Sequence, residues 1–334
     1  MMHVRSSGNI VLVLAGIIII LGAMKAAAVI VVPILLASFI AIIISPIYAW
    51  LIEKGVPAAL ALLAVMGALM IIFSLIGVLI GSSVHSFSDN IPLYEAQLQI
   101  QLDVVTAKLN SLGIIDGELG SLFNPSSLMK YSATVLKGAG SVLTNSFMIV
   151  LIIAFMLLES TNFAGKLEKA NGANTSMAQI NEVFSKIKHY MAIKAVVSLV
   201  TGLLITAILM MMGLDYAILW GFIVFLFNFI PNIGSILAAV PAVLLALVQL
   251  GGMGALEIAA VYLIINITIG SIIEPKLMGS GLGISTLVVF LSLIFWGWLL
   301  GPVGMLLSIP LTITIKIMLY SEEKTRWLAH LMSN

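Results

Sequence analysis

The stretch Pro231-Asn232-Ile233-Gly234-Ser235-Ile236-Leu237-Ala238-Ala239-Val240-Pro241 interrupts a long apolar region of the chain. Proline lacks an amide hydrogen and glycine loosens the backbone, so the stretch predicts a break between two helices. A similar break, Gly301-Pro302-Val303-Gly304, precedes Met305-Leu306-Leu307-Ser308-Ile309-Pro310. Residues 195–250 and 255–320 are therefore each interpreted as one membrane span followed by a helical hairpin. Paired breaks at corresponding positions are the sequence feature that best indicates the substrate site of a secondary transporter.

The composition places the whole chain in a membrane. Hydrophobic residues make up 61% of its 334 residues and charged residues 9%, whereas a soluble domain carries about 25% charge. The net charge of +1 and the lack of a basic stripe argue against a nucleic-acid partner. The chain has no cysteine and its four histidines are scattered, so we expect no metal site and no cofactor.

The apolar runs predict an all-α polytopic membrane protein. Six full spans are expected, at residues 10–23, 26–50, 57–83, 140–158, 195–213 and 255–273. The first hairpin arm, residues 216–230, would be only about 22 Å long as a helix, against a hydrocarbon core of about 30 Å. We therefore expect two re-entrant hairpins, with eight full spans as the alternative.

The predicted spans divide the chain into seven parts. They are scaffold spans in 1–83, extracytoplasmic amphipathic helices in 84–137, the fourth span in 138–158, a cytoplasmic linker helix in 159–194, a span with the first hairpin in 195–250, a span with the second in 251–320, and a cytoplasmic tail in 321–334.

Lysine and arginine set the expected orientation, because these residues are enriched in cytoplasmic loops. The segment 159–194 holds five lysines, whereas 84–137 holds three lysines and five acids. Both termini are therefore expected in the cytoplasm. The first hairpin would then enter the membrane from outside and the second from inside, which makes the two units an inverted repeat.

The polar segment 84–137 has its own helical pattern. Its apolar residues recur at helical spacing, as Tyr94, Leu98, Leu102, Val105, Leu109 and Leu112. An amphipathic helix of this kind lies in the membrane interface, packs against a neighbouring subunit, or covers its own protomer. The sequence leaves these three alternatives open.

Polar residues in the last third supply the candidate site. From 195 to 320 only five residues are charged, Asp215, Glu257, Glu274, Lys276 and Lys316, and ionisable groups inside a membrane indicate function by default. Glu274 lies eight residues after Asn266, on the same helix face. We expect Asn266, Ser271 and Glu274 to line a path opposite Asn228, Asn232 and Ser235. The alternative is that Asn266 and Ser271 only join helices by hydrogen bonds.

Chemistry other than transport finds little support. The chain has no Gly-x-x-x-x-Gly-Lys-[Ser/Thr] phosphate loop, so ATP is not the evident energy source. It has no Ser/His/Asp or zinc-protease arrangement, and no catalytic residue is expected. Gly279-Ser280-Gly281-Leu282-Gly283 follows a predicted membrane helix rather than a strand, so we interpret it as a flexible hinge.

Three motifs carry a resemblance to a known family: Phe229 to Pro241, Glu274-Pro275-Lys276-Leu277-Met278-Gly279, and Leu299 to Pro310. In this order they resemble the autoinducer-2 exporter family, also called PerM-like permeases, over nearly the whole chain. The resemblance implies a protein of the bacterial inner membrane that forms homo-oligomers, with pentamers in one group. It also implies either export of the quorum-sensing signal autoinducer-2 or sodium–proton exchange.

The leading hypothesis is a secondary transporter that exports a small polar solute, autoinducer-2, by alternating access at the two broken hairpins. Its partners would be that solute and the surrounding membrane lipid. The expected pathway residues are Asn228, Pro231, Asn232, Gly234, Ser235, Asn266, Ser271, Glu274, Gly301, Pro302 and Gly304. One alternative is a sodium–proton antiporter, for which Glu274 or Glu159 would be the ion-coupling carboxylate. A second is a membrane scaffold or receptor that carries no solute.

Overall fold

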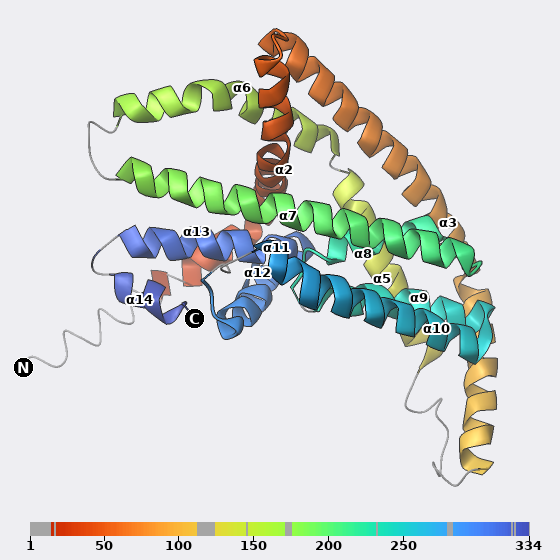
Figure 1. Ribbon diagram of the computed structural model, residues 1–334. Coiled ribbons are helices and arrows are strands. Elements are labelled where there is room, and N and C mark those ends of the chain that lie inside the picture. The colour runs from red at the N-terminus through yellow and green to blue at the C-terminus, as the bar shows by residue number, and fades with distance from the viewer. Residues whose placement is uncertain are drawn as a thin grey trace, which may run out of the picture.

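The computed structural model describes residues 15–16, 18–111, 124–144, 146–170, 176–231, 233–278, 283–321, 323 and 325–333. Every regular element in these ranges is a helix. In chain order they are α2 (Ala28–Glu53), α3 (Ala58–Ser111), α5 (Pro125–Thr144), α6 (Ser146–Ala170), α7 (Ser176–Met211), α8 (Ala217–Phe227), α9 (Gly234–Gln249), α10 (Gly251–Ile265), the π-helix η1 (Asn266–Ile273), α11 (Glu274–Met278), α12 (Thr286–Leu306), α13 (Ser308–Ser321) and α14 (Arg326–Leu331) (Figure 1).

The chain is an all-α, multi-pass membrane protein by the length and apolar character of its helices. Five helical segments of the described part are long and apolar enough to cross a membrane, namely Ala28–Glu53, Ala58–Val104, Ser185–Met211, Gly251–Met278 and Thr286–Leu306. The predicted fourth span corresponds to a shorter apolar helix, Ser146–Glu159. The predicted first span lies partly outside the described residues, which include 15–16 and 18–23 of it.

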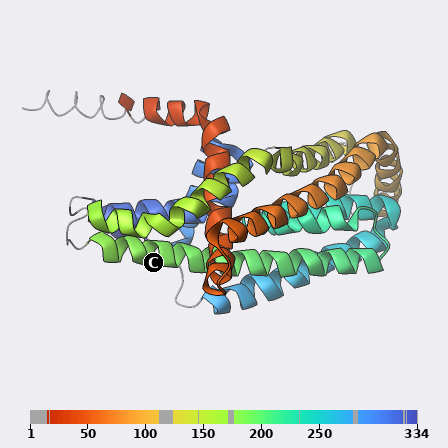
Figure 2. The same cartoon turned by 90° about the horizontal axis from the view of Figure 1, so that it is seen from above.

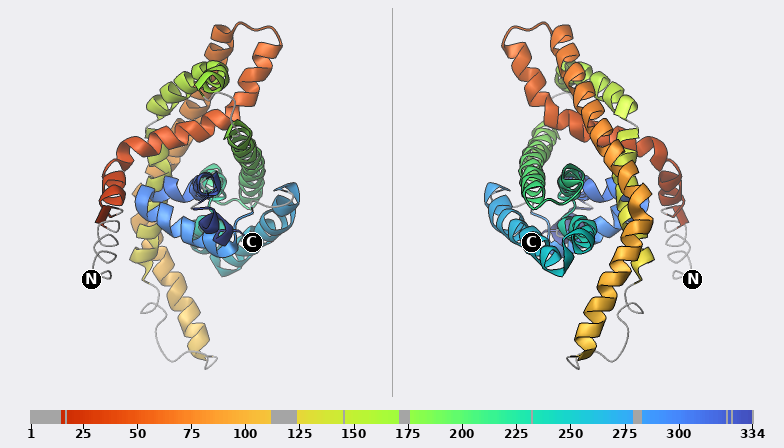
Figure 3. Two further views of the ribbon diagram at one scale, coloured as in Figure 1. Left: turned by 90° about the vertical axis from the view of Figure 1, so that its left-hand side faces the viewer. Right: turned by 90° about the vertical axis from the view of Figure 1, so that its right-hand side faces the viewer.

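In the first hairpin, α8 packs mainly on α7 and α9 packs mainly on α10. Figure 3 shows these helices nearly end-on as one bundle, with α3 crossing its side. Glycines allow the close approach of α7 and α8. A Cβ atom at Gly202 would lie 2.7 Å from the Gly221 carbonyl oxygen, and a Cβ at Gly221 would lie 1.8 Å from Thr206 Oγ1. Small residues at such crossings are typical of helix packing in membranes.

The second hairpin is formed by α12 and α13. The helical backbone of α12 is interrupted at Gly301, where φ is 70° and ψ is −154°, a conformation that favours glycine. The break predicted at Gly301-Pro302 is therefore present. The part of α12 before it, residues 286–300, is about 22 Å long. Trp296 Nε1 donates to Thr312 Oγ1 at 3.0 Å and joins the two arms. Re-entry of the two hairpins stays a prediction.

The helix α3 runs through residue 83 without interruption and is 54 residues long, about 81 Å. The expected division between the third span and the polar segment is thus not a helix end. Side chains of the polar part, Phe87, Tyr94 and Leu98, are buried in one cluster with Met129 of α5 and Trp220 of α8. Of the three alternatives, the structure shows packing on the hairpin of the same chain.

The remaining helices cross this bundle. The helix α2 packs on α6, α7 and α12, and seen from above it runs across α6 and α7 (Figure 2). A second apolar cluster joins Ala37 and Tyr48 of α2, Ala61 of α3 and Ile153 of α6. The expected linker helix and the fifth span form one continuous helix, α7.

Candidate functional site

Both hairpin turns depend on a glycine that touches the arm before it. A Cβ at Gly234 would lie 1.8 Å from the Phe227 carbonyl oxygen, and a Cβ at Gly304 would lie 2.1 Å from that of Trp296. Each turn therefore folds back so closely that a side chain at the glycine would collide with backbone. Pro231 precedes the first glycine by three residues. Asn232, between them, lies outside the described residues.

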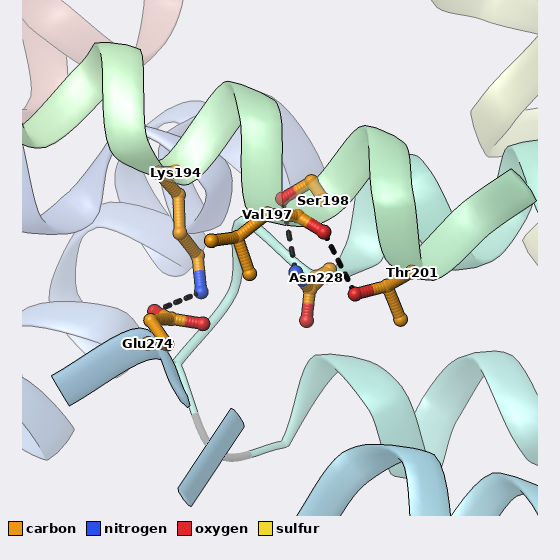
Figure 4. Close-up of polar contacts among 6 residues, drawn as sticks. All are labelled: Lys194, Val197, Ser198, Thr201, Asn228 and Glu274. Carbon is orange, nitrogen blue, oxygen red and sulfur yellow. Dashed lines mark hydrogen bonds and ion pairs between the residues drawn. The ribbon is translucent and has the colours of Figure 1, made fainter. Parts of the chain in front are cut away.

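A stripe of polar side chains on α7 faces the first hairpin and the end of the sixth span. Lys194, Ser198 and Thr201 are spaced i, i+4 and i+7, which places them on one helix face. Figure 4 shows all three directed from α7 toward Asn228 and Glu274. Ser198 bonds to Asn228 at the hairpin and Lys194 to Glu274 of α11, whereas the Thr201 hydroxyl bonds to the Val197 carbonyl within α7.

Asn228 ends α8 and is buried. Its backbone N–H donates to the Val224 carbonyl at 2.8 Å, and its side-chain Nδ2 donates to Ser198 Oγ at 3.0 Å. The Thr201 hydroxyl donates to the Val197 carbonyl at 2.8 Å. The neighbouring helix α7 therefore holds the Asn228 side-chain amide through its nitrogen. The side-chain oxygen Oδ1 remains available as a hydrogen-bond acceptor.

A small cavity lies behind this contact. It is lined by polar groups of α7, the first hairpin, α10 and η1, and by apolar side chains between them: Thr201, Ile205, Val224, Asn228, Ser235, Tyr262, Ile265, Asn266, Ile269 and Gly270. Its volume is about 10 Å³, enough for about one water molecule. Asn228, Ser235 and Asn266, three of the predicted pathway residues, thus meet at one point.

Asn266 begins a π-helix that extends to Ile273. A π-helix closes its hydrogen bonds from i to i+5, and such segments occur frequently at functional sites. A Cβ at Gly270 would lie 3.2 Å from Asn266 Oδ1. Because glycine has no side chain, it leaves room for the Asn266 amide. The widened turn also changes the register along this span. Asn266 lines the cavity, whereas Glu274 faces Lys194.

Lys194 and Glu274 form a buried ion pair. Lys194 Nζ lies 2.5 Å from Glu274 Oε1, and the two side chains are 6% and 14% exposed. The pair links α7 to the first residue of α11. A buried charge is expensive unless it is paired, so each of the two residues is the counter-charge of the other. The structure describes no group of three or more His, Asp or Glu side chains able to hold a metal.

Other predicted site residues lie apart from the cavity. Ser271 is exposed on η1, and Glu159 is exposed on α6, a helix that packs on α2, α3 and α5. Pro231 lines a second cavity of about 270 Å³ with Ile233 and the start of α12, including Thr286 and Phe290.

The second turn does not reach these spaces, since neither cavity is lined by Gly301, Pro302 or Gly304. The second turn is far from the cavity at Thr286 because Thr286 begins the first arm and the turn ends it, about 22 Å further along the helix. Pro302 is exposed and Gly304 is buried. Val303, next to them, belongs to an apolar cluster that Phe229 of the first hairpin also contacts.

Four residues of the site were missed by the sequence analysis: Lys194, Ser198, Thr201 and Tyr262. The first three had a readable signal, since polar residues at i, i+4 and i+7 on an apolar helix indicate a face turned toward the protein interior. Lys194 was instead assigned to the cytoplasmic linker. Tyr262 had no signal, because a tyrosine in an apolar span is unremarkable until its surroundings are known.

Comparisons with known proteins cover nearly the whole chain. The sequence model of the AI-2E family transporter matches residues 10–322. The AI-2 transport protein TqsA of Escherichia coli K12 is 38% identical over 98% of this chain and 96% of its own length. A Haemophilus influenzae protein, named only for transport, is 40% identical over 96% and 95% of the two lengths. YhhT of Escherichia coli K12, also named only for transport, is 34% identical over 98% and 95%. A match of this extent places the chain in the AI-2E family of membrane transporters.

Proposed function

We propose that this transporter exports a small, uncharged polar solute through the cavity at the first hairpin, and that the solute is autoinducer-2. The observation that carries the proposal is the convergence of Asn228, Ser235 and Asn266, from three separate elements, on one cavity. The printed name of TqsA supplies the solute to test.

The chemistry of the lining suits a neutral, hydroxyl-rich solute. Two amides and three hydroxyls (Thr201, Ser235 and Tyr262) line the cavity, and none of its lining residues is charged. Such groups donate and accept hydrogen bonds without holding a counter-ion. A carboxylate or phosphate ligand would lack a cation within this lining, so an uncharged solute fits better than an anion.

The cavity is too small to hold a solute in this conformation. A volume of about 10 Å³ holds about one water, so a solute enters only if the hairpin moves away from α7 or α10. Movement of a hairpin-bearing repeat against a scaffold is the usual form of alternating access. In our proposal the second hairpin, with Gly301, Pro302 and Gly304, performs the corresponding movement for the opposite face.

Solute flux from proteoliposomes tests this assignment. Asn228→Ala and Asn266→Ala should each lower autoinducer-2 efflux strongly, because each removes both hydrogen-bonding atoms of an amide that lines the cavity. Asn110→Ala is the matched control, since Asn110 is exposed on α3 outside the cavity, and it should retain wild-type flux. Unchanged flux in both cavity variants would show that the solute takes another route.

The Lys194–Glu274 pair supports a second candidate, sodium–proton exchange. In this pair a lysine balances a buried carboxylate. A sodium ion or a proton that binds to the Glu274 carboxylate would release it from Lys194. Sodium-driven pH change in proteoliposomes would favour this function if Glu274→Gln abolishes it and Glu159→Gln does not. The autoinducer-2 assay run in parallel separates the two functions.

Orientation and assembly belong to the same proposal. Both termini would face the cytoplasm at the bacterial inner membrane, as the lysine distribution predicts. Apolar residues that are exposed on α2 and α3, among them Val29, Leu63 and Ile71, would contact lipid or further copies of the chain in a homo-oligomer.

A further inference from the structure

Asn228 is held in place at the end of the first hairpin arm through both its backbone and its side chain. Its backbone N–H donates to the Val224 carbonyl at 2.8 Å. Its side-chain Nδ2 donates to Ser198 Oγ at 3.0 Å. Asn228 is 8% exposed and Ser198 is 0% exposed, so bulk water does not compete for the bond between them.

This bond sets the direction of the Asn228 carbonyl group. The nitrogen and the oxygen of a side-chain amide point in different directions from its terminal carbon. With Nδ2 bonded to Ser198 on α7, Oδ1 lies on the side away from α7, as Figure 4 shows. The elements on that side are the ones that complete the small cavity, which α9, α10 and η1 also line.

The oxygen Oδ1 of Asn228 is open to a partner from outside the chain. It has no hydrogen bond to any other described residue. It is also not one of the enclosed polar atoms without a partner in the described part of the chain, which are the hydroxyls of Tyr48, Tyr262 and Ser308. Because buried polar groups are nearly always satisfied, an accessible and unpaired oxygen at a cavity is a position for a hydrogen-bond donor.

The neighbouring Thr201 also faces the cavity as an acceptor. Its hydroxyl hydrogen is donated to the Val197 carbonyl at 2.8 Å, so Thr201 cannot donate to a solute without losing this bond. The wall that α7 and the end of α8 form therefore presents hydrogen-bond acceptors to the cavity.

We propose that Ser198 is a positioning residue for solute recognition. Ser198 does not line the cavity, so it acts through Asn228, whose carbonyl oxygen it directs toward the solute. The site then selects a solute group that donates a hydrogen bond, namely a hydroxyl. An ether, a ketone or a fluorine at the same position is disfavoured, because a site built to bond a hydroxyl rejects an analogue that lacks it.

This inference rests on the proposed passage of a solute through the cavity, and it adds the chemical class of that solute and the residue that selects it. The two proposals can fail separately. Any hydroxylated solute that the protein carries tests the selection of a donor, whereas only autoinducer-2 tests the proposed export.

Flux of paired solutes from proteoliposomes that contain the full-length protein tests the inference. The solutes are autoinducer-2 and erythritol, each compared with analogues in which fluorine replaces one hydroxyl group at a time. Fluorine has nearly the size of a hydroxyl group but no hydrogen to donate. At one position or more, the exchange should lower kcat/KM of the wild type by about threefold to tenfold, the contribution of one hydrogen bond.

Three variants identify the residue responsible. Ser198→Ala removes the acceptor of Asn228 Nδ2, so the amide is free to turn, and the ratio of hydroxylated to fluorinated flux should fall toward one. A purely structural role would lower both fluxes equally and keep the ratio. Asn228→Ala should also bring the ratio toward one, and adding Ser198→Ala to it should change nothing further.

Ser132→Ala is the matched control. Ser132 is likewise 0% exposed and bonded through its hydroxyl, but it lies on α5 and does not line the cavity. Its substitution should keep the ratio of the wild type.

Several results would overturn the inference. Equal flux of hydroxylated and fluorinated solutes by the wild type would do so even if Ser198→Ala does not fold, and faster flux of a fluorinated solute would show that the amide nitrogen faces the solute instead. A wild-type ratio in Ser198→Ala would remove Ser198 from recognition. Donor-selective flux of erythritol without autoinducer-2 flux would support the inference and refute the proposed export, whereas flux of neither solute would overturn both.

Discussion

At the scale of single residues, the two hairpin turns share one steric rule. Gly234 and Gly304 each lie where a methyl group would collide with a carbonyl oxygen of the preceding arm. The contact lets each arm reverse direction within a few residues. It also lets the second arm pack directly on the first.

Substitution of these glycines should weaken the fold. Gly234→Ala places a Cβ 1.8 Å from the Phe227 carbonyl oxygen, and overpacking of this kind costs about 1–3 kcal/mol or more. We expect a lower unfolding temperature in detergent, followed by tryptophan fluorescence. Gly67→Ala is the control, because open space surrounds Gly67 in α3 and alanine favours a helix. An equal unfolding temperature for the two variants would contradict the steric account.

The buried ion pair gives a second prediction. Lys194→Met leaves the Glu274 carboxylate unpaired at 14% exposure, and loss of one partner of a buried pair costs about 3–5 kcal/mol. The double variant Lys194→Met with Glu274→Gln should recover much of that loss, since no buried charge remains. Thermal unfolding of both singles and the double forms the cycle. A double variant as unstable as the sum of the singles would show that the charges do not interact.

The polar residue types predicted this site better than the expected positions of the residues along the spans did. Asn228, Ser235 and Asn266 were identified because polar groups beside helix breaks in an apolar region have few solvated positions. Ser271 was grouped with Asn266 and Glu274, whose shared face assumed an α-helical register that the π-helix replaces. Glu274 was expected to line the path with Asn266. Lys194 on the adjacent helix makes its surroundings a buried ion pair, and that proximity is tertiary.

At the scale of elements, the polar half of α3 and α5 form a cover on the first hairpin. Their side chains Tyr94, Leu98 and Met129 are buried in the cluster that contains Trp220. The apolar stripe of this segment was readable from its spacing, but a stripe does not specify which surface it contacts. In the structure it packs against the first hairpin of the same chain.

The cover should contribute to the stability of the protein. Leu98 is 0% exposed and Leu93, on the same helix, is 54% exposed. Leu98→Ala should lower the free energy of unfolding by about 2–5 kcal/mol, as large-to-small core substitutions do, and Leu93→Ala should change it by less than about 0.5 kcal/mol. Chemical unfolding in detergent micelles compares the two. Similar losses for both would mean that the segment packs elsewhere in solution.

At the scale of the whole molecule, the structure shows a state closed to a solute, because its candidate cavity is too small to hold one. The cavity holds about one water, and Ser198, which bonds to the cavity residue Asn228, is fully buried. The sequence predicted the broken hairpins and the membrane class, because helix breakers and apolar runs act locally. It could not predict which conformation the packed helices adopt, because that depends on contacts between distant segments.

The absence of cysteine from the chain makes this closed state measurable. Ser198→Cys, buried behind Asn228, should react slowly with a maleimide. The reaction should accelerate when autoinducer-2 is added, if the solute shifts the population toward an open state. Ser86→Cys is the control, since Ser86 is exposed on α3 and should react rapidly in both conditions. Fast reaction of Ser198→Cys without solute would contradict a closed resting state.

The length of α3 has a mechanical consequence. One helix of 54 residues connects the scaffold near α2 and α6 with the cover on the first hairpin. Pro92 lies inside it and cannot donate a hydrogen bond to the carbonyl four residues earlier. The helix therefore bends most easily at this proline, and the cover can follow a moving hairpin while the scaffold half of the helix stays still.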